Sequence, residues 1–301
     1  MKSGSGDTNW GIRVVITSYG PDSSYVGGIA SPNSFNSSKD TPCFVYNTRF
    51  ESMAEACSHE VGHTLGLSHD GTQTNGTTTA GYYYGHGSGE TSWAPIMGVG
   101  YNRNVTTWDN GAYFGSNNGG TSANHGHGPD DMTVITNYNG FGFRQDTIGN
   151  SLTSATPLTV SSGTAAQYGT ILTRLDKDVF SFQLTNAGSV NLTVDPYWYR
   201  AFVTTSGVWG GSNFTYTAPV TPARANLDVS ADLYNAAGVL LASANPAGLA
   251  ATLSCSGLPA GTYFLQVDGV GFGNPTNNPP TGYTDYASVG NYWISGTISN
   301  A

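Results

Sequence analysis

Residues 59–70 read His-Glu-Val-Gly-His-Thr-Leu-Gly-Leu-Ser-His-Asp and decide how the first third of the chain is interpreted. They overlap the end of a segment, 51–67, that contains no proline and, before the exit at Gly66, only one glycine, Gly62, which predicts a helix. At about 100° per residue, His59 and His63 lie on one helix face, one turn apart. Two imidazoles at this spacing can share one metal ion, and zinc is the ion that this pattern favours.

The rest of the motif completes a candidate catalytic site. Gly66 lets the chain leave the helix sharply, because glycine tolerates a positive φ, and the turn can return His69 as a third zinc ligand. Three protein ligands leave the fourth position to water, as in catalytic zinc sites. Glu60 is a candidate general base that does not bind the metal. The alternative is an ordinary helix with chance histidines, although the full motif fixes five positions.

The opposite face of this helix is expected to pack on a sheet. Met53, Cys57, Val61 and Thr64 cluster there. The chain has 3 cysteines, too few for a disulfide framework. A bridge between Cys43 and Cys57 stays open, but the helix position favours Cys57 as a small buried hydrophobic residue.

Short strands precede the helix, and loops follow it. The sequence predicts strands over 11–19 and 43–46, and a glycine- and proline-broken edge strand over 27–35. Residues 71–128 are rich in Gly, Asn and Tyr and read as loops. A short helix is predicted to start at Pro129, because acidic residues follow it directly.

From about residue 149 the pattern changes to alternating apolar segments separated by turns. This pattern predicts an all-β sandwich, with a domain boundary near residues 144–150. The predicted strands are 179–184, 190–194, 227–234, 239–242, 263–267 and 292–298. The fold class is therefore α+β in the first part and all-β in the second.

The bulk composition excludes some function classes. Charged residues make up 10% of the 301, and the formal net charge is −9. The sequence therefore lacks the excess of basic residues that is typical of nucleic-acid-binding proteins. No apolar run is long enough for a membrane span. The N-terminal MKSGSGDTNW lacks an apolar core and does not read as a signal peptide. We expect an exported protein whose signal was removed or lies upstream.

The motif HEVGHTLGLSHD, followed by APIMGVGY at 94–101, resembles the metzincin zinc peptidases. Asp70 after the third histidine is similar to the reprolysin-type branch. The resemblance implies a zincin-like fold, Zn²⁺ as cofactor, Glu60 as catalytic base, and Met97 as the floor beneath the ligands in a Met-turn. It also implies that the strand over 27–35 pairs with extended peptide.

Two features depart from the metzincin pattern. Only 58 residues precede His59, so the N-terminal subdomain is expected to be shortened. Some metzincins have a zinc-binding tyrosine two residues after the turn methionine, where this chain has Val99. The role is not transferred to Tyr101.

The second part resembles the bacterial pre-peptidase C-terminal domain, a jelly-roll-like sandwich. The matching stretches are DKDVFSFQL (176–184), ANLDVSADLYNAAGVLLAS (225–243), LPAGTYFLQVDGVG (258–271) and VGNYWISG (289–296). The resemblance implies a secreted, extracellular bacterial protein, with a peptidase domain over 1–145 and a sandwich domain over 146–301.

Three further groups of residues have two readings each. His86, His125 and His127 lie in glycine-rich loops and read as exposed histidines, or as residues that contact substrate or a second metal ion. The segment 82–84 and Trp93 could line a pocket beyond the scissile bond, or only pack in loops. Carboxylates that could help bind Ca²⁺, or serve as ordinary turn residues, are Asp176, Asp178 and Asp228.

The function predicted from these features is zinc-dependent hydrolysis of internal peptide bonds in proteins, by a monomer with no nucleic-acid partner and no membrane insertion. One alternative is a catalytically silent extracellular module that attaches to matrix or polysaccharide through its sandwich. Another is a zinc hydrolase of a non-protein substrate. The intact Glu60 and the three histidines favour the peptidase.

Overall fold

The chain folds into two compact units, as a computed structural model shows. The structure describes residues 1–18, 26–47, 50–118, 123–196, 204–209, 212–217 and 225–300. The first unit comprises Met1–Ser88, Ser92–Phe143 and Gly273–Tyr283. The second unit comprises Gly89–Thr91, Arg144–Phe272 and Thr284–Ala301. A short segment late in the sequence thus belongs to the first unit.

A small three-stranded sheet begins the first unit. Its strands are β1 (Val14–Ile16), β2 (Gly28–Ile29) and β3 (Cys43–Val45), in the order β1-β3-β2. β3 is central and pairs parallel with β1 and antiparallel with β2. Each lies within a predicted strand but is shorter, and β2 is at the edge as predicted. The end of the first predicted strand, at Tyr19, lies outside the described residues.

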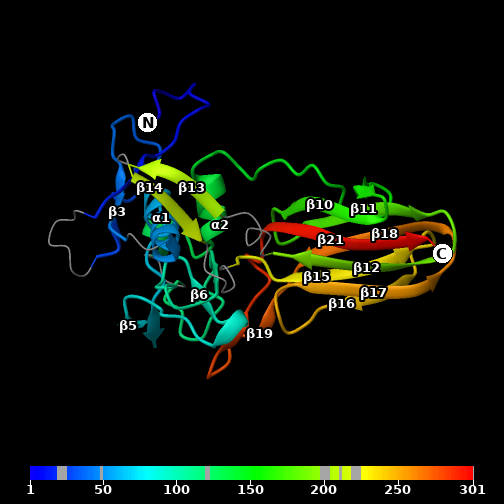
Figure 1. The fold of residues 1–301 in the computed structure, drawn as a ribbon. Coiled ribbons are helices and arrows are strands. Elements are labelled where there is room, and N and C mark those ends of the chain that lie inside the picture. The colour runs from blue at the N-terminus through cyan, green and yellow to red at the C-terminus, as the bar shows by residue number, and fades with distance from the viewer. Residues whose placement is uncertain are drawn as a thin grey trace. The chain divides into compact units, whose positions relative to one another are not determined.

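Helix α1 (Phe50–Thr64) packs against this sheet (Figure 1). It ends where the sequence predicts an exit, because Gly66 has a φ of 107°. The Gly66 amide donates to the His63 carbonyl at 3.0 Å, and the Leu67 amide donates to the Gly62 carbonyl at 3.0 Å. These bonds satisfy carbonyls at the end of the helix and turn the chain back toward its histidine face.

The remainder of the first unit consists of short elements joined by loops. Asp130 caps α2, as its side chain accepts a hydrogen bond from the Thr133 amide at 2.8 Å, close to the predicted helix start. A small apolar core joins the turn after α1 to this part of the unit through Leu67, Ile96, Met97 and Val134. The elements are β4 (Thr72–Thr74), β5 (Thr77–Ala80), β6 (Trp93–Pro95), β7 (Val105–Thr107), η2 (Ala123–Gly126), α2 (Asp131–Thr133), the π-helix η3 (Val134–Tyr138) and β20 (Thr281–Tyr283), which pairs with β19 (Phe272–Asn274).

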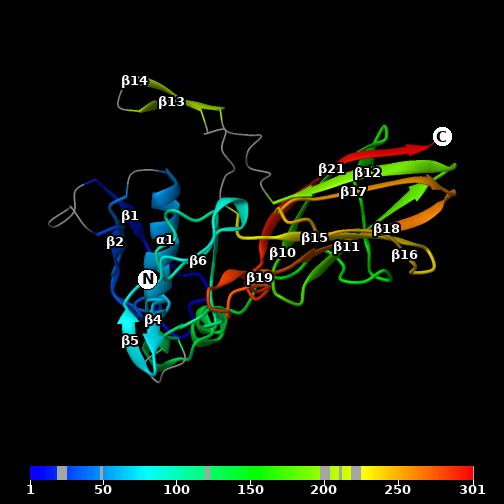
Figure 2. The same ribbon diagram turned by 90° about the horizontal axis from the view of Figure 1, so that it is seen from below.

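The second unit is a β-sandwich, as predicted (Figures 1 and 2). One five-stranded sheet has the order β17-β12-β21-β10-β9, and the other has the order β16-β15-β18-β11-β8. Their strands are β8 (Thr156–Pro157), β9 (Val160–Ser161), β10 (Thr164–Ile171), β11 (Lys177–Leu184), β12 (Gly188–Asp195), β15 (Val229–Asn235), β16 (Leu240–Ala244), β17 (Ala251–Leu258), β18 (Gly261–Gly269) and β21 (Gly290–Asn300). Phe180, Leu192 and Leu265 are among the buried apolar side chains that fill the space between the sheets.

All six strands predicted for this unit are present. β10 and β17 were not predicted, nor was the antiparallel pair β13 (Thr204–Trp209) and β14 (Ser212–Thr217). Within the described ranges, no helix combines the length and apolar character that a membrane span requires.

The three cysteines, all in described ranges, are free thiols. The Cys43–Cys57 disulfide that the sequence left open is therefore not formed. Cys43 is fully buried on the central strand β3, where burial raises the pKa of its thiol to about 11. Cys57 is only half-buried on α1.

Candidate metal centre

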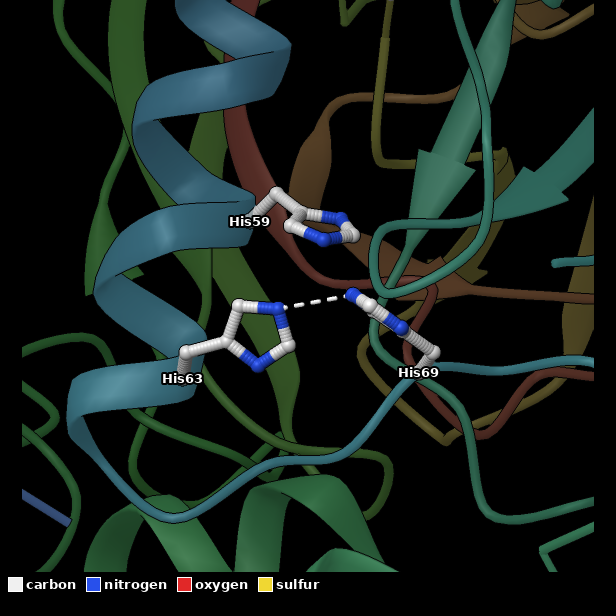
Figure 3. Close-up of side chains that lie close together, drawn as sticks. All are labelled: His59, His63 and His69. Carbon is white, nitrogen blue, oxygen red and sulfur yellow. Dashed lines mark hydrogen bonds between the residues drawn. The ribbon is translucent and has the colours of Figure 1, made fainter. Parts of the chain in front are cut away.

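Helix α1 and the turn after it bring three imidazoles together. The ring centroids of His59 and His63 are 4.8 Å apart, as expected for side chains one helical turn apart. The His69 ring lies 5.2 Å from that of His59 and 4.7 Å from that of His63. One nitrogen of each ring lies within 4.8 Å of the other two. Figure 3 shows the three side chains converging from the helix and the returning turn.

Backbone carbonyls fix the orientation of two of these rings. Nδ1 of His59 lies 2.8 Å from the Ile96 carbonyl oxygen, and Nδ1 of His63 lies 2.8 Å from that of Leu67. A carbonyl oxygen can only accept, so both Nδ1 atoms donate and both Nε2 atoms keep a free lone pair. Nε2 of His63 lies 3.0 Å from Nε2 of His69 (Figure 3). A shared cation suits these facing nitrogens.

The third histidine is held through its two neighbours. The Ser68 amide donates to Oδ1 of Asn124 at 3.0 Å. The Asp70 amide donates to the Met97 carbonyl at 2.9 Å, and the buried Asp70 carboxylate accepts from Asn118. His69 therefore sits between two anchored residues, so its position depends on contacts that form only in the folded chain.

Met97 lies beneath the helix at the level of the histidines. Its side chain is fully buried. A methyl group added at Gly62, between His59 and His63, would come within 2.6 Å of Met97 Sδ. The neighbouring Ile96 carbonyl binds His59, so the segment around Met97 supports two of the three histidines.

Glu60 is buried beside the histidines and faces the same cleft. Its exposed fraction is 5%, and burial raises the pKa of its carboxyl group to about 7. The side chain lies against Gly28 of β2, where an added methyl group would come within 2.6 Å of both Glu60 Cγ and Oε1. The edge strand β2 and the Glu60 carboxylate are thus in direct contact.

The cleft has a volume of about 690 Å³. Residues of the edge strand, among them Gly28 and Ile29, line it together with the three histidines and Glu60. Tyr82 and Tyr101 also reach it. A groove of this size can enclose part of a chain-like ligand while its metal-binding nitrogens stay accessible.

The donor set fits a zinc ion. Zinc prefers neutral imidazole nitrogens, and burial lowers the pKa of His59 to about 3 and that of His69 to about 4, which favours the neutral rings. Ligand bonds of about 2.0–2.1 Å in a tetrahedral site separate two nitrogens by about 3.3 Å. The His63–His69 spacing of 3.0 Å is close to this. The carbonyl partners of His59 and His63 are typical of histidines that bind metals.

The aromatic segment after the histidines divides into two groups. Tyr82 and Tyr84 line the cleft, which fits the pocket reading. Trp93 is instead buried, and the half-buried Tyr83 stacks on the buried Tyr113 with ring centroids 4.5 Å apart. For these two residues the structure agrees with the second alternative from the sequence, in which the aromatic side chains only pack within the loops.

The three loop histidines have different environments. The reading of His86 as exposed is wrong: it is buried, Nδ1 pairs with the Tyr83 hydroxyl at 2.7 Å, and Nε2 with the Gly282 carbonyl at 2.6 Å. His125 is exposed and lines the cleft. His127 is exposed and packs on Tyr138, with centroids 3.7 Å apart.

Sequence reasoning missed Gly28 and Asn124 as parts of the site. Both act through tertiary contacts, one with Glu60 and one with Ser68. The glycine pair at 27–28 in a strand pattern was the one available sign, since such glycines often mark a close approach. Nothing in the sequence marks Asn124.

A second group of potential metal ligands lies in the second unit. Carboxylate oxygens of Asp146, Asp176 and Asp178 lie within 4.8 Å of one another. Asp176 is 4% exposed and Asp178 is 0% exposed, and one oxygen of each has no hydrogen-bond partner among the described residues. Asp228, which the sequence grouped with them, is not in this group, and Asp146 takes its place.

The three-histidine cleft defines a candidate metal site of the kind found in zinc hydrolases. The family model described as Metallo-peptidase family M12B Reprolysin-like matches residues 2–70. This range contains the 59–70 motif and confirms the resemblance to that family over this part of the chain.

Two further comparisons concern solved structures and curated proteins. A solved structure, the pre-peptidase C-terminal domain of collagenase from Bacillus anthracis, is similar at 13% identity and a TM-score of 0.27, covering 52% of this chain and 98% of that domain. Comparison with curated proteins finds no match.

Proposed function

We propose that this chain is a secreted zinc-dependent endopeptidase of the metzincin type. The observation that carries the proposal is the convergence of His59, His63 and His69 in an open cleft, with two Nδ1 atoms fixed by carbonyls. The reprolysin-like match over residues 2–70 supports a metallopeptidase independently.

In this proposal His59, His63 and His69 hold the zinc ion through the ring nitrogens that face one another. When bound, zinc supplies Lewis acidity, which polarises the scissile carbonyl and acidifies water. The chain itself supplies the fixed ring orientations through Ile96 and Leu67, and Met97 packs beneath the site. We assign Met97 a supporting role.

Glu60 is the proposed general base. Its carboxylate takes a proton from the attacking water and returns it to the amide nitrogen as the C–N bond breaks. Its position in the cleft supports this role. Burial also supports it, because a pKa of about 7 suits a group that both accepts and donates a proton near neutral pH.

Protein or peptide substrates fit the cleft. β2 is an edge strand whose second edge pairs with no strand among the described residues, and it lines the cleft beside Glu60. An extended peptide can add to such an edge through backbone hydrogen bonds and present a peptide bond to the site. We expect a monomer, with no nucleic-acid partner because of the net charge of −9.

We further propose a division into a zincin-like domain over 1–145 and a pre-peptidase C-terminal-like domain over 146–301. Extracellular location in a bacterium is proposed from the resemblance of the strand segments in the second part. Bound Ca²⁺ is proposed at Asp146, Asp176 and Asp178, because buried carboxylate oxygens without partners require a cation or a proton.

The test compares the wild type with Glu60→Gln and His69→Ala. We expect about one zinc per chain in the wild type and in Glu60→Gln, and cleavage of casein and a peptide library by the wild type alone, with the Glu60→Gln rate reduced at least about 10³-fold. Zinc is measured by elemental analysis, and His69→Ala should lose it.

Two outcomes would overturn the proposal. One is full cleavage by Glu60→Gln, which would remove the assigned base. The other is a zinc-loaded wild type that cleaves no peptide in the library, which would favour the catalytically silent binding module.

A further inference from the structure

Tyr82 lies over the histidine cluster. Its ring centroid is 4.2 Å from that of His69 and 6.4 Å from that of His59, with only 25° between the planes of the Tyr82 and His59 rings. The residue is 39% exposed and lines the cleft beside Glu60. Burial, followed by the Glu60 charge, raises the pKa of the Tyr82 hydroxyl, which agrees with a position near that carboxylate.

The Tyr82 hydroxyl has no hydrogen-bond partner among the described residues, unlike its neighbours. The Tyr83 hydroxyl pairs with His86 at 2.7 Å, and the Tyr101 hydroxyl accepts a bond from Asn47 at 3.0 Å. A tyrosine hydroxyl with a partly buried ring usually finds a partner. The Tyr82 hydroxyl group is therefore available to donate a hydrogen bond to a ligand in the cleft.

The next residue holds Tyr82 in place. The Tyr83 amide donates to the Asp70 carbonyl at 2.7 Å, and the Tyr83 carbonyl accepts from the Val99 amide at 2.9 Å. The Tyr83 ring stacks on Tyr113 at an angle of 11°. Asp70 directly follows His69, so Tyr82 is tied to the same backbone that positions the third histidine. Such anchoring suits a donor that must act without rearranging.

We infer that Tyr82 is a further catalytic residue, whose hydroxyl donates a hydrogen bond to the carbonyl oxygen of the scissile peptide. The inference rests on the proposed peptidase function. As the water oxygen bonds to the carbonyl carbon, negative charge moves to the carbonyl oxygen, and the Tyr82 hydroxyl stabilises it while keeping its own proton. Glu60 carries the transferred proton to the leaving nitrogen, so the C–N bond breaks with atoms and charges balanced.

The experiment compares Tyr82→Phe with Tyr138→Phe in the full zinc-loaded chain. Tyr138 is 50% exposed, is not among the residues that line the cleft, and serves as the control. We expect Tyr82→Phe to lower kcat about 10- to 100-fold with little change in KM, less than the loss of a fully buried oxyanion donor because the site is partly open. Tyr138→Phe should keep the wild-type kcat.

Two further readouts separate catalysis from structure. Zinc content should be unchanged in Tyr82→Phe, since the ring that contacts His69 is retained. A phosphinic peptide, which mimics the tetrahedral state, should bind Tyr82→Phe more weakly by a factor similar to the loss in kcat.

Equal kcat in the two variants would overturn the inference while leaving the proposed function intact. A loss of activity in Tyr82→Phe that only follows a loss of zinc would overturn it as well, by making Tyr82 structural. Absence of zinc-dependent cleavage in the wild type would instead remove the proposed function on which the inference rests.

Discussion

The contact between Glu60 and Gly28 shows how one glycine governs the site. A side chain at position 28 would come within 2.6 Å of the Glu60 carboxylate and 2.7 Å of the Phe44 carbonyl oxygen. Both approaches are closer than real Cβ contacts, so the strand or the glutamate would have to move. Gly28 is therefore required here by a close approach between two elements.

We predict that Gly28→Ala retains zinc but lowers kcat/KM about 10- to 100-fold. The methyl group would displace the Glu60 carboxylate, and a displacement of about 1 Å can cost a factor of about 100 in rate. Steady-state kinetics and zinc analysis measure this, with Gly11→Ala as control because the space around Gly11 is open. Wild-type kinetics in Gly28→Ala would show that the Glu60 position is not critical.

The residues of the metal site could be predicted because their arrangement depends on their spacing along the sequence. His59 and His63 follow from helix geometry, and Gly66 was predicted as the turn, where it has a positive φ. The contacts of Gly28 and Tyr82 were not predictable. They join segments separated by tens of residues, and no local pattern determines which strand faces Glu60 or which ring covers His69.

The side chain of Asn139 connects three segments of the first unit through hydrogen bonds. Its buried amide donates to the Leu65 carbonyl beyond the end of α1 at 2.9 Å and to the Val134 carbonyl of η3 at 3.1 Å. Its oxygen accepts from Asn36 at 2.9 Å. The turn that carries His69 back toward the helix is therefore tied to the π-helix by one side chain.

We predict that Asn139→Ala destabilises the first unit by about 2–3 kcal/mol, because buried carbonyls lose their donor. Asn137→Ala, two residues earlier on η3 and exposed, should change the free energy of unfolding by less than about 0.5 kcal/mol. Urea denaturation of the zinc-free forms measures both. Equal stability of the two variants would contradict the linking role of Asn139.

The predictability of the elements depended on their length and amphipathic pattern. Helix α1 begins one residue before the predicted start, and the strands with large alternating apolar residues, such as Lys177–Leu184, were found. Strands Thr164–Ile171 and Ala251–Leu258 were missed because small and polar residues interrupt their alternation. Strands β4 to β7, which lie in the range that reads as loops, have only three or four residues each, too few for a period to appear, and tertiary contacts define them.

The two units are stabilised by separate means. The sandwich has an extensive apolar core between its two sheets, whereas the buried apolar side chains described for the first unit come from short strands, one helix and the loops between them. Ordering long loops costs conformational entropy that regular secondary structure does not offset in this unit. A bound metal ion is then expected to contribute a large share of the stability of the first unit.

We therefore predict two thermal transitions that respond to different ions. Phenanthroline, which removes zinc but not calcium, should lower the first-unit transition by roughly 5–10 °C, because a ligand at 100 times its Kd contributes about 2.7 kcal/mol. Calcium added to metal-free protein should raise only the sandwich transition. Scanning calorimetry measures both, with His69→Ala insensitive to phenanthroline and Asp178→Asn insensitive to calcium. If either reagent moved both transitions equally in the wild type, the ions would not act at separate sites, and the assignment of one metal to each unit would be wrong.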